Sequence, residues 1–372
     1  MNQGWEKKSL SEVCQKESSN LMQKNIDPEQ GLYPVYGANN IVGYLDYYVQ
    51  PKDYIGIIKD GSGVGRVNVY PKQSSLLGTL QYIIPNDNMD LHYTAYVLQS
   101  MNLAKYASGA AIPHIYFKDY GKEKIGVPSL IKQKEIAEEL DKINELIEVK
   151  RSQLADLDLL AQSLFYEMFG DPIDNPKGWN LYKLGDCAEF KNGLNFTPSD
   201  NGNEIKCLGV GNFKSNRYIT DESLPSINIV ELVSKEYLLK DGDIVFVRSN
   251  GNKALIGRSI LYVSKGADAT FSGFCIRCRF DHAKYDPLYM VYLLSSKTIR
   301  HYMTSQGKGC NISNINQKIL SAMPFIVPPI ELQDQFAAKI KMIEEQKNLI
   351  NSSIADLQIL LASRMDYWFN NI

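Results

Sequence analysis

One stretch of this chain occurs twice, and this repeat limits the possible folds more than any other feature of the sequence. Residues 127–170 and 327–370 align without a gap, and 13 of the 44 aligned positions are identical. Both copies begin with Val-Pro, and Gln133 of the first copy corresponds to Gln333 of the second. A repeat of this kind indicates two equivalent structural units. The chain therefore divides into segment, helix, segment and helix.

Both copies carry apolar residues at alternating spacings of four and three, which predicts an apolar seam along a long helix. The seam residues are Ile136, Leu140, Ile143, Ile147, Leu154 and Leu157 in the first copy and Phe336, Ile340, Ile343, Ile350, Ile354 and Leu357 in the second. A helix from residue 131 to 169 would be roughly 58 Å long at 1.5 Å per residue, so its seam needs a partner of similar length. We therefore predict that the two copies form an antiparallel coiled coil. The alternative is that each copy is an ordinary core helix of its own domain.

Further apolar side chains lie outside the seam of each copy. One antiparallel helix pair need not cover them, so we expect these faces to bind two equivalent partner subunits. The alternative is that the other domains of the chain pack over them. The residues concerned are Leu146, Val149, Phe165, Phe169, Leu349, Leu360 and Phe369.

The composition is that of a globular protein with two or three domains, since 44% of the 372 residues are hydrophobic and 22% are charged. No apolar run approaches the ~18 residues of a membrane span, no signal core is visible, and the six cysteines form no disulfide framework. We therefore expect a cytoplasmic protein without membrane contact. The net charge is −2, but residues 131–170 and 331–372 together hold −6. The remaining +4 permits a phosphate-binding face.

The segments between the repeats also look related to each other. In residues 53–66 and 243–258, an apolar strand is followed by a basic residue, a Gly-rich polar loop, and Gly-Arg leading into another strand. This order predicts a hairpin-like turn. Short strand-like runs, such as Tyr54–Ile58 and Ile244–Val247, alternate with helix-like stretches such as Leu288–Tyr302.

These patterns predict an α+β fold with two pseudo-symmetric domains joined by the coiled coil. The first domain should span residues 1–126 and the second 178–326. The long helices should occupy residues 127–170 and 327–372, and a Pro- and Gly-rich linker should occupy 171–177.

Several motifs that could carry catalysis fail on their context. The glycines of Gly61–Gly65 lead into a strand, so no helix N-terminus faces a phosphate. Strand periodicity would turn Cys275 and Cys278 to opposite faces, and no second pair completes a zinc site. The charged residues within 200–206 only faintly resemble a metal-nuclease triad, which chance explains better. We therefore expect no catalytic residue, metal or cofactor in this chain.

Polar and basic loops remain as candidate binding groups. Arginine, lysine and asparagine side chains contact guanine and adenine edges in the major groove and also bind phosphates. Taken singly, each of these residues is more often a turn residue. The DNA-contact candidates are Lys59, Ser62, Arg66 and His114 in the first segment and Arg248, Asn250, Asn252, Lys253, Arg258, Lys308, Asn311 and Asn314 in the second.

Three stretches point to a known family: VPPIELQ at the start of the second long helix, MFGDPIDNPKGW after the first, and YPVYGANNIVGY at residues 33–44. Together with the repeat, the layout resembles the specificity subunit of type I restriction-modification systems. The resemblance implies two target recognition domains, each reading one half of a bipartite double-stranded DNA target. It also implies that the long helices set the spacing and dock two methyltransferase subunits, with restriction subunits completing the complex. S-adenosylmethionine and ATP with magnesium would belong to those partners.

Two other functions stay open at this stage. The chain could be a self-contained DNA methyltransferase or nuclease, although it lacks a cofactor motif. It could also be a scaffold whose coiled coil spaces two domains that do not bind DNA. Salt-sensitive DNA binding would distinguish the specificity subunit from the scaffold.

Overall fold

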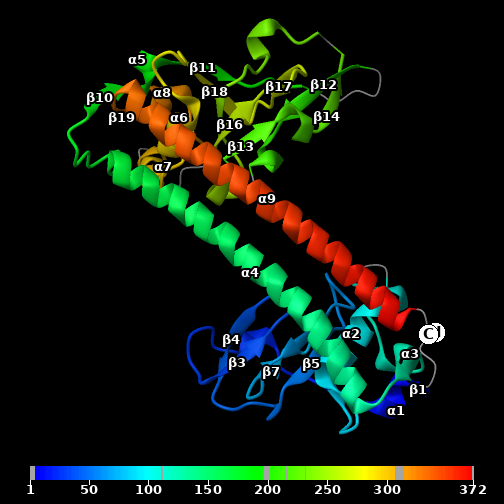
Figure 1. Cartoon of the computed structure of the whole chain (residues 1–372). Coiled ribbons are helices and arrows are strands. Elements are labelled where there is room, and N and C mark those ends of the chain that lie inside the picture. Colours follow the sequence, from blue (N-terminus) through cyan, green and yellow to red (C-terminus); the bar gives the residue numbers. More distant parts are fainter. Residues whose placement is uncertain are drawn as a thin grey trace. The chain divides into compact units, whose positions relative to one another are not determined.

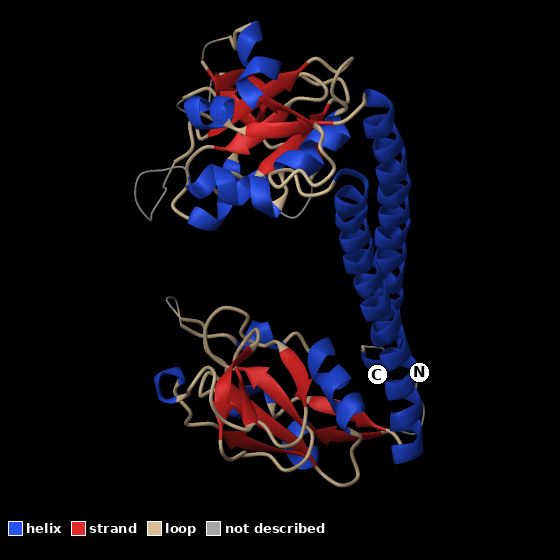
Figure 2. Ribbon diagram, turned by 90° about the vertical axis from the view of Figure 1, so that its left-hand side faces the viewer, coloured by secondary structure: helices blue, strands red, loops and turns tan. Residues whose placement is uncertain are grey.

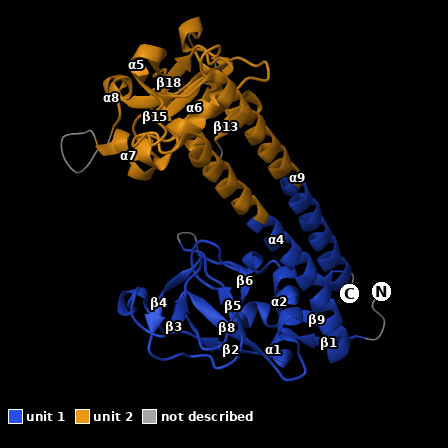
Figure 3. Cartoon of the chain, turned by 60° about the vertical axis from the view of Figure 1, so that its left-hand side comes forward, with its two compact units in different colours: residues 1–152, 350–372 blue, residues 153–349 orange. Residues whose placement is uncertain are grey.

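The computed structural model describes residues 5–109, 112–196, 202–213, 217–230, 232–305 and 314–370. The chain forms two compact units, of which unit 1 contains residues 1–152 and 350–372 and unit 2 contains residues 153–349 (Figure 3). Both units combine β-sheets with helices, so the predicted α+β class is confirmed (Figure 2). No helix of the described residues is long and apolar enough to cross a membrane.

Two helices of 40 residues, α4 (Leu130–Phe169) and α9 (Ile330–Phe369), each pass through both units (Figures 1 and 3). Both helices begin three residues later than the predicted helical segments. The valine of each Val-Pro pair is the last residue of the preceding strand, and the proline directly follows that strand. At the end of α4, the N–H of Gly170 donates to the Tyr166 carbonyl at 2.8 Å. Gly170 has φ +78°, a left-handed conformation that glycine adopts without strain and that commonly ends a helix.

The two long helices pack in antiparallel fashion in each unit. In unit 1, Arg364 near the end of α9 donates to Glu139 near the start of α4. In unit 2, Lys347 Nζ of α9 lies 2.8 Å from Asp158 Oδ1 in the second half of α4. Every residue of the predicted seam is buried or half-buried. The ends of the helices also join the domain cores, as Ile136 does in unit 1, so the structure combines the two interpretations of the repeat.

The domain of unit 1 contains a four-stranded antiparallel sheet in the order β2-β8-β5-β6, a three-stranded sheet in the order β4-β3-β7, and the pair β1-β9. Ile55 and Ile57 of β5 face the core that contains helix α2, whereas Tyr54 and Ile58 face a second, smaller core. The strands are β1 Glu6–Ser9, β2 Cys14–Ser18, β3 Tyr33–Tyr36, β4 Ile41–Leu45, β5 Tyr54–Ile58, β6 Val67–Tyr70, β7 Ser75–Leu76, β8 Leu80–Pro85 and β9 Lys124–Val127. The helices are α1 Leu10–Val13, η1 Gln23–Asn25, α2 Leu91–Ser100, η2 Leu103–Tyr106 and α3 Phe117–Tyr120.

The domain of unit 2 contains a five-stranded sheet in the order β11-β18-β15-β16-β13, a three-stranded sheet in the order β14-β12-β17, and the pair β10-β19. The strands are β10 Asn180–Lys183, β11 Ala188–Asn192, β12 Asn203–Leu208, β13 Tyr218–Thr220, β14 Ser226–Ile229, β15 Ile244–Val247, β16 Ser259–Val263, β17 Ala269–Phe271, β18 Cys275–Phe280 and β19 Pro324–Val327. The helices are α5 Leu184–Cys187, η3 Val210–Asn212, η4 Asp221–Ser223, η5 Lys235–Tyr237, η6 Lys253–Leu255, α6 Pro287–Leu294, α7 Lys297–Ser305 and α8 Gln317–Ala322.

Both domains follow one topology, which confirms the predicted pseudo-symmetry. The sheet β2-β8-β5-β6 corresponds to β11-β18-β15-β16, and β4-β3-β7 corresponds to β14-β12-β17. Strand β13, which joins β16 in parallel, is an addition in the second domain. Cys275 and Cys278 of β18 belong to different core clusters on opposite faces of the sheet, as the strand period predicted.

The prediction that Phe165 and Phe169 lie on an outward, partner-binding face of α4 is wrong. Phe165 is 2% exposed and Phe169 is fully buried. The Phe169 ring centroid lies 4.7 Å from that of Tyr289 in α6, and Trp179 Nε1 donates to the Phe169 carbonyl at 2.8 Å. The second domain therefore packs over this end of α4. Phe369, at the equivalent position of α9, is half-buried against the core of the first domain.

Candidate DNA-binding loops

In the first domain, the Gly-rich loop of residues 59–66 joins β5 to β6 as the predicted hairpin. The Ile58 N–H donates to the Arg66 carbonyl at 3.0 Å, and the Gly65 N–H donates to the Ile58 carbonyl at 2.8 Å. Gly65 has φ +87°, and a Cβ at this position would lie 2.6 Å from the backbone nitrogen of Ala104. The loop is therefore a tight turn with fixed ends. Ser62 and Arg66 are exposed on it, and Lys59 is half-buried.

The second domain repeats this hairpin between β15 and β16. The Val247 N–H donates to the Arg258 carbonyl at 2.9 Å, and the Gly257 N–H donates to the Val247 carbonyl at 3.0 Å. Lys59 and Arg248 therefore occupy equivalent positions directly after a buried strand, and Arg66 and Arg258 occupy equivalent positions at the other end of the loop.

Asn250 and Asn252 have turn roles in this second hairpin. Asn250 Oδ1 accepts the Asn252 N–H at 2.8 Å, and Asn252 Oδ1 accepts the Ala254 N–H at 3.0 Å and so caps η6. These bonds shape the loop, which presents Asn252 and Lys253 at its exposed tip. The two asparagines thus have a structural role whether or not they also contact DNA.

In each domain a second loop lies against the hairpin. The Ile115 N–H donates to the Lys59 carbonyl at 3.0 Å, and the Ile315 N–H donates to the Arg248 carbonyl at 2.9 Å. These bonds accompany two isolated β-bridges, Asp60 with His114 and Ser249 with Asn314. We call Asp60–His114 and Ser249–Asn314 the bridge pairs. The structure therefore brings His114 and Asn314, both predicted from the sequence, beside the hairpins.

The bridge pair of the first domain carries a side-chain network. His114 Nδ1 is hydrogen-bonded to Asp60 Oδ1, and Lys59 Nζ lies 3.9 Å from Asp60 Oδ2. The Tyr116 ring centroid lies 4.1 Å from that of His114, and Lys118 Nζ lies 5.0 Å from the Tyr116 centroid. Tyr116 and Lys118 were not predicted as contacts. The mixture of aromatic and basic residues directly after His114 was the signal that could have identified them.

In the second domain, a further arginine supports the hairpin. Arg258 Nη1 donates to the Phe213 carbonyl at 3.2 Å. Arg300 of α7 donates through Nε to the Ile256 carbonyl at 3.4 Å and through Nη2 to the Ala254 carbonyl. Burial, and then the positive charge of Arg258, lower the pKa of the Arg300 guanidinium. The loop therefore concentrates positive charge, which suits a polyanionic partner.

Two of the predicted contacts cannot be placed, because Lys308 and Asn311 lie outside the described residues. Asn314, which follows them, is exposed.

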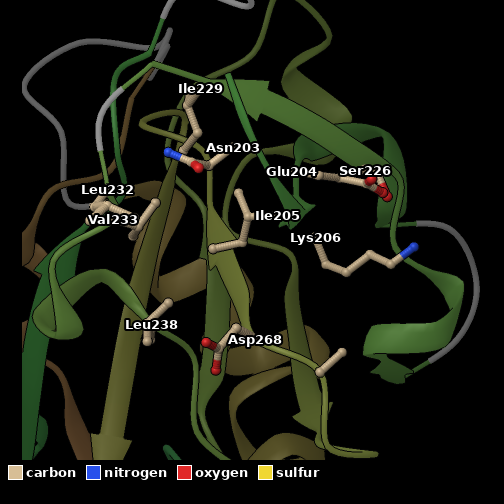
Figure 4. Close-up of a pocket in the computed structure, with 11 residues that line it drawn as sticks. Asn203, Glu204, Ile205, Lys206, Ser226, Ile229, Leu232, Val233, Leu238 and Asp268 are labelled. Carbon is tan, nitrogen blue, oxygen red and sulfur yellow. The ribbon is translucent and has the colours of Figure 1, made fainter. Parts of the chain in front are cut away.

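A surface pocket of about 450 Å³ lies over β12 and β14, and none of its lining residues belongs to the hairpins or the second loops. Its charged side chains are Glu204, Lys206 and Asp268, and Figure 4 shows them spread around the pocket instead of converging on one point. No group of residues in the described ranges has the composition and geometry to hold a metal ion. Asp200, the other member of the faint nuclease-like triad, lies outside those ranges.

Comparison with known proteins decides the family. Residues 2–158 and 176–358 match the family model of the type I restriction modification DNA specificity domain. The chain belongs to this family. The match covers both domains and most of both long helices, so the resemblance predicted from the sequence is confirmed.

Named relatives are type I restriction enzyme specificity subunits. The chain is 26% identical over 291 residues to the StySPI specificity subunit of Salmonella potsdam, and this match covers 74% of the chain and 61% of the relative. It is 24% identical over 314 residues to the MjaVIII specificity subunit of Methanocaldococcus jannaschii, covering 77% of the chain and 71% of the relative. The match thus spans about three fifths of the StySPI subunit.

Solved structures show the same fold. The S subunit of the type I restriction-modification system from M. genitalium has a TM-score of 0.55 at 17% identity, with 99% of this chain and 96% of that chain covered. A chain from a structure on complex assembly and conformational transition of the type I R-M system has a TM-score of 0.57 at 16% identity, with 98% and 97% covered.

Proposed function

We propose that this chain is the non-catalytic DNA-recognition subunit of a type I restriction-modification complex. Each domain binds one half of a bipartite double-stranded DNA target. It does so through its hairpin and through the second loop, which the bridge pair joins to the hairpin. The long helices set the spacing between the half-sites and dock partner subunits. This function belongs in the cytoplasm, where the chromosome and invading DNA are found.

The observation that carries the proposal is the recurrence of two basic positions in the hairpins of both domains. Lys59 and Arg248 stand at one equivalent position of the hairpins, and Arg66 and Arg258 stand at another. Recurrent basic positions suit phosphates, which are the same in every sequence, whereas side chains that differ between the domains suit bases. Family membership supports the same function.

Exposed apolar side chains on the helices support two equivalent protein partners. Three pairs of positions related by the repeat are exposed and apolar in both copies: Val149 and Leu349, Leu159 and Ile359, and Leu160 and Leu360. In unit 2, Leu159 and Leu160 directly follow Asp158, whose carboxylate binds Lys347, two residues before Leu349. A monomer that leaves such residues exposed on both copies suits two docked subunits.

We identify these partners as two methyltransferase subunits, with restriction subunits completing the complex. S-adenosylmethionine and ATP with magnesium would bind to the partners. In this proposal the chain itself supplies binding and orientation, because its loops offer hydrogen-bond donors and positive charge.

The test is selection of duplexes from a random library by the chain assembled with its methyltransferase subunits, followed by mapping of the methylated bases. We expect two short fixed sequences separated by an unread spacer, and binding that weakens steeply with salt. Methyl transfer by the purified chain alone would favour the self-contained enzyme. Salt-insensitive binding without sequence preference would favour the scaffold.

A further inference from the structure

We propose that the bridge pairs select one base in each half-site, with Asn314 reading adenine through two hydrogen bonds and His114 reading its base through one. This inference rests on the proposed function and assigns recognition chemistry to two positions. It begins from the finding that the backbone of both bridge pairs is held in the same way. The N–H of the residue that follows, Ile115 or Ile315, donates to the residue after the buried strand, Lys59 or Arg248. The two positions therefore share this backbone contact and differ in the side chains that they present.

The hydrogen bond to Asp60 restricts what His114 can offer. An ionised carboxylate only accepts hydrogen bonds, so Nδ1 of His114 carries the proton of that bond. The ring of Tyr116, 4.1 Å away between centroids, also restricts the imidazole. Within the described residues, Nε2 has no hydrogen-bond partner. One ring nitrogen is thus left to meet one atom of a base edge.

The bridge pair of the second domain has different chemistry. Ser249 stands where the first domain has Asp60, and the exposed Asn314 stands where it has His114. A side-chain amide presents a donor and an acceptor together, which matches N7 and N6 of adenine in the major groove. Two hydrogen bonds discriminate between bases more strictly than one, so the second domain should require adenine where the first domain tolerates more than one base.

Neighbouring charge places both bridge pairs where DNA would pass. Lys59 and Arg248 directly precede Asp60 and Ser249 in the hairpins. In the first domain Lys118 adds a second cation beyond Tyr116, and in the second domain Arg258 and Arg300 lie in and behind the hairpin. Cations near both bridge pairs suit the phosphates next to a read base pair.

The experiment exchanges the two side chains in the full chain, assembled with its methyltransferase subunits, and repeats selection from a random duplex library. Asn314→His should reduce the preference for adenine at one position of one half-site by roughly 5- to 150-fold, the range of one bidentate contact. His114→Asn should create an adenine preference at one position of the other half-site. In both variants the remaining positions and the spacer should stay unchanged. His92→Asn, at a histidine that binds Asp141 of α4, and Asn228→His on β14 are matched controls that should leave both half-sites unchanged.

Asp60 is tested as a positioning residue. Asp60→Asn keeps an oxygen that accepts from His114 Nδ1, so the base preference of the first half-site should persist. Asp60→Ala removes the acceptor, so the preference at the His114 position should broaden while the other positions persist. Equal preferences in Asp60→Asn and Asp60→Ala would contradict this role.

Wild-type base preferences in both Asn314→His and His114→Asn would overturn the inference, as would weaker binding of all sequences to the same extent. Failure of the wild-type complex to select any bipartite sequence would instead contradict the proposed function. The two failures are therefore distinguishable.

Discussion

Arg364 of α9 donates to both carboxylate oxygens of Glu139 in α4, with Nη2 3.1 Å from Oε2. Trp368 Nε1 donates to the same Oε2 at 3.2 Å, so two residues of the last turns of α9 meet one carboxylate near the start of α4. The pKa of Glu139 lies below its ordinary value of 4.5, and the hydrogen bond from Arg364 is the largest cause of this shift. The same hydrogen bond raises the pKa of Arg364. Within unit 1, this contact links the last turns of α9 to the first part of α4.

Replacing Glu139 by Gln should lower the stability of unit 1 at pH 7 by at most about 1 kcal/mol, because both side chains are about one-third exposed and water screens the pair. For a unit of this size the Tm should fall by roughly 2–4 °C. The pKa of Glu139 is lower in the folded than in the unfolded protein. Its contribution to the free energy of unfolding is therefore fully present above the pKa of the unfolded state and is lost as the pH falls through the pKa of the folded state. Melting curves of wild type and variant should therefore converge under acid.

Glu148→Gln is the matched control, because Glu148 binds Arg151 of the same helix and both side chains are more exposed. Its effect should be smaller at every pH. A Glu139→Gln deficit that is as large at pH 3 as at pH 7 would show that the ion pair is not its cause.

A second prediction concerns Gln133 and Gln333, which are identical in the repeat and fully buried. Gln133 accepts the Asp90 N–H at 2.8 Å and donates to the carbonyls of Asn88 and Pro128 at 3.1 and 3.0 Å. Gln333 accepts the Asp286 N–H at 3.0 Å and donates to the Pro328 carbonyl at 2.9 Å. Each glutamine thus fastens the start of a long helix to the N-cap of a domain helix, α2 or α6.

Leucine at either position removes these partners, and the carbonyls of Pro128 and Pro328 are then buried without one, at about 1–3 kcal/mol for each group. Gln133→Leu and Gln333→Leu should therefore destabilise their units by similar amounts, because Asn88, the additional acceptor of Gln133, is exposed and its carbonyl can bond to water instead. The effects should add in the double variant because the sites lie in different units. Thermal unfolding measures both, with the exposed Gln153→Leu as control. A strong deviation from additivity would contradict the independence of the two anchors.

Local patterns in the sequence predicted the elements that depend on neighbouring residues. The strands Tyr54–Ile58 and Ile244–Val247 have the predicted bounds, and the long helices differ from the prediction only at their ends. The stretch 288–302, predicted as one helical run, is instead two helices, α6 and α7. Ser296 between them accepts the Ile299 N–H through Oγ, a local bond that competes with helix continuation.

Contacts between distant residues could not be predicted in the same way. Phe169 packs against Tyr289, which lies 120 residues further along the chain. The sequence shows that Phe169 is apolar, but it does not show which residues cover it. Likewise Asp60 and His114 are 54 residues apart, and no spacing rule joins them. The sequence therefore indicated which loops are polar and basic, whereas the bridge pairs became visible only in the structure.

A third prediction separates base contacts from phosphate contacts at the equivalent positions Lys59 and Arg248. Because this basic position recurs in both domains, Arg248→Ala should weaken binding to all sequences alike, as loss of a phosphate contact does. A contact to a base edge would instead cost ~1–3 kcal/mol of binding free energy and relax one position of one half-site. The half-buried side chain lies with Nη1 3.5 Å from the Gly273 carbonyl, so it is partly held in place. Lys59→Ala applies the same test to the other half-site. Uniform weakening over all sequences would identify a phosphate contact, and unchanged affinity would remove the residue from the interface.

The last prediction concerns the helices as a spacer. A shortening that preserves the seam must remove one heptad from each helix at facing places, because seven residues restore the 3.5-residue period. The first turns of α4 are unsuitable, since Ile136 and Leu140 belong to the core of the first domain. Residues 149–155 and 349–355 are related by the repeat and contain no residue of the core clusters of either domain, so their removal spares those cores.

Each deletion shortens its helix by roughly 10 Å at 1.5 Å per residue, which equals about three base pairs at 3.4 Å each. We expect both half-site sequences to persist while the unread spacer shortens, as measured by selection from a library with all spacer lengths. Removal of three residues from each helix is the control: it breaks the seam register, so it should lower the Tm without defining a new spacer. Altered bases within a half-site at an unchanged spacer would show that the helices do not set the spacing.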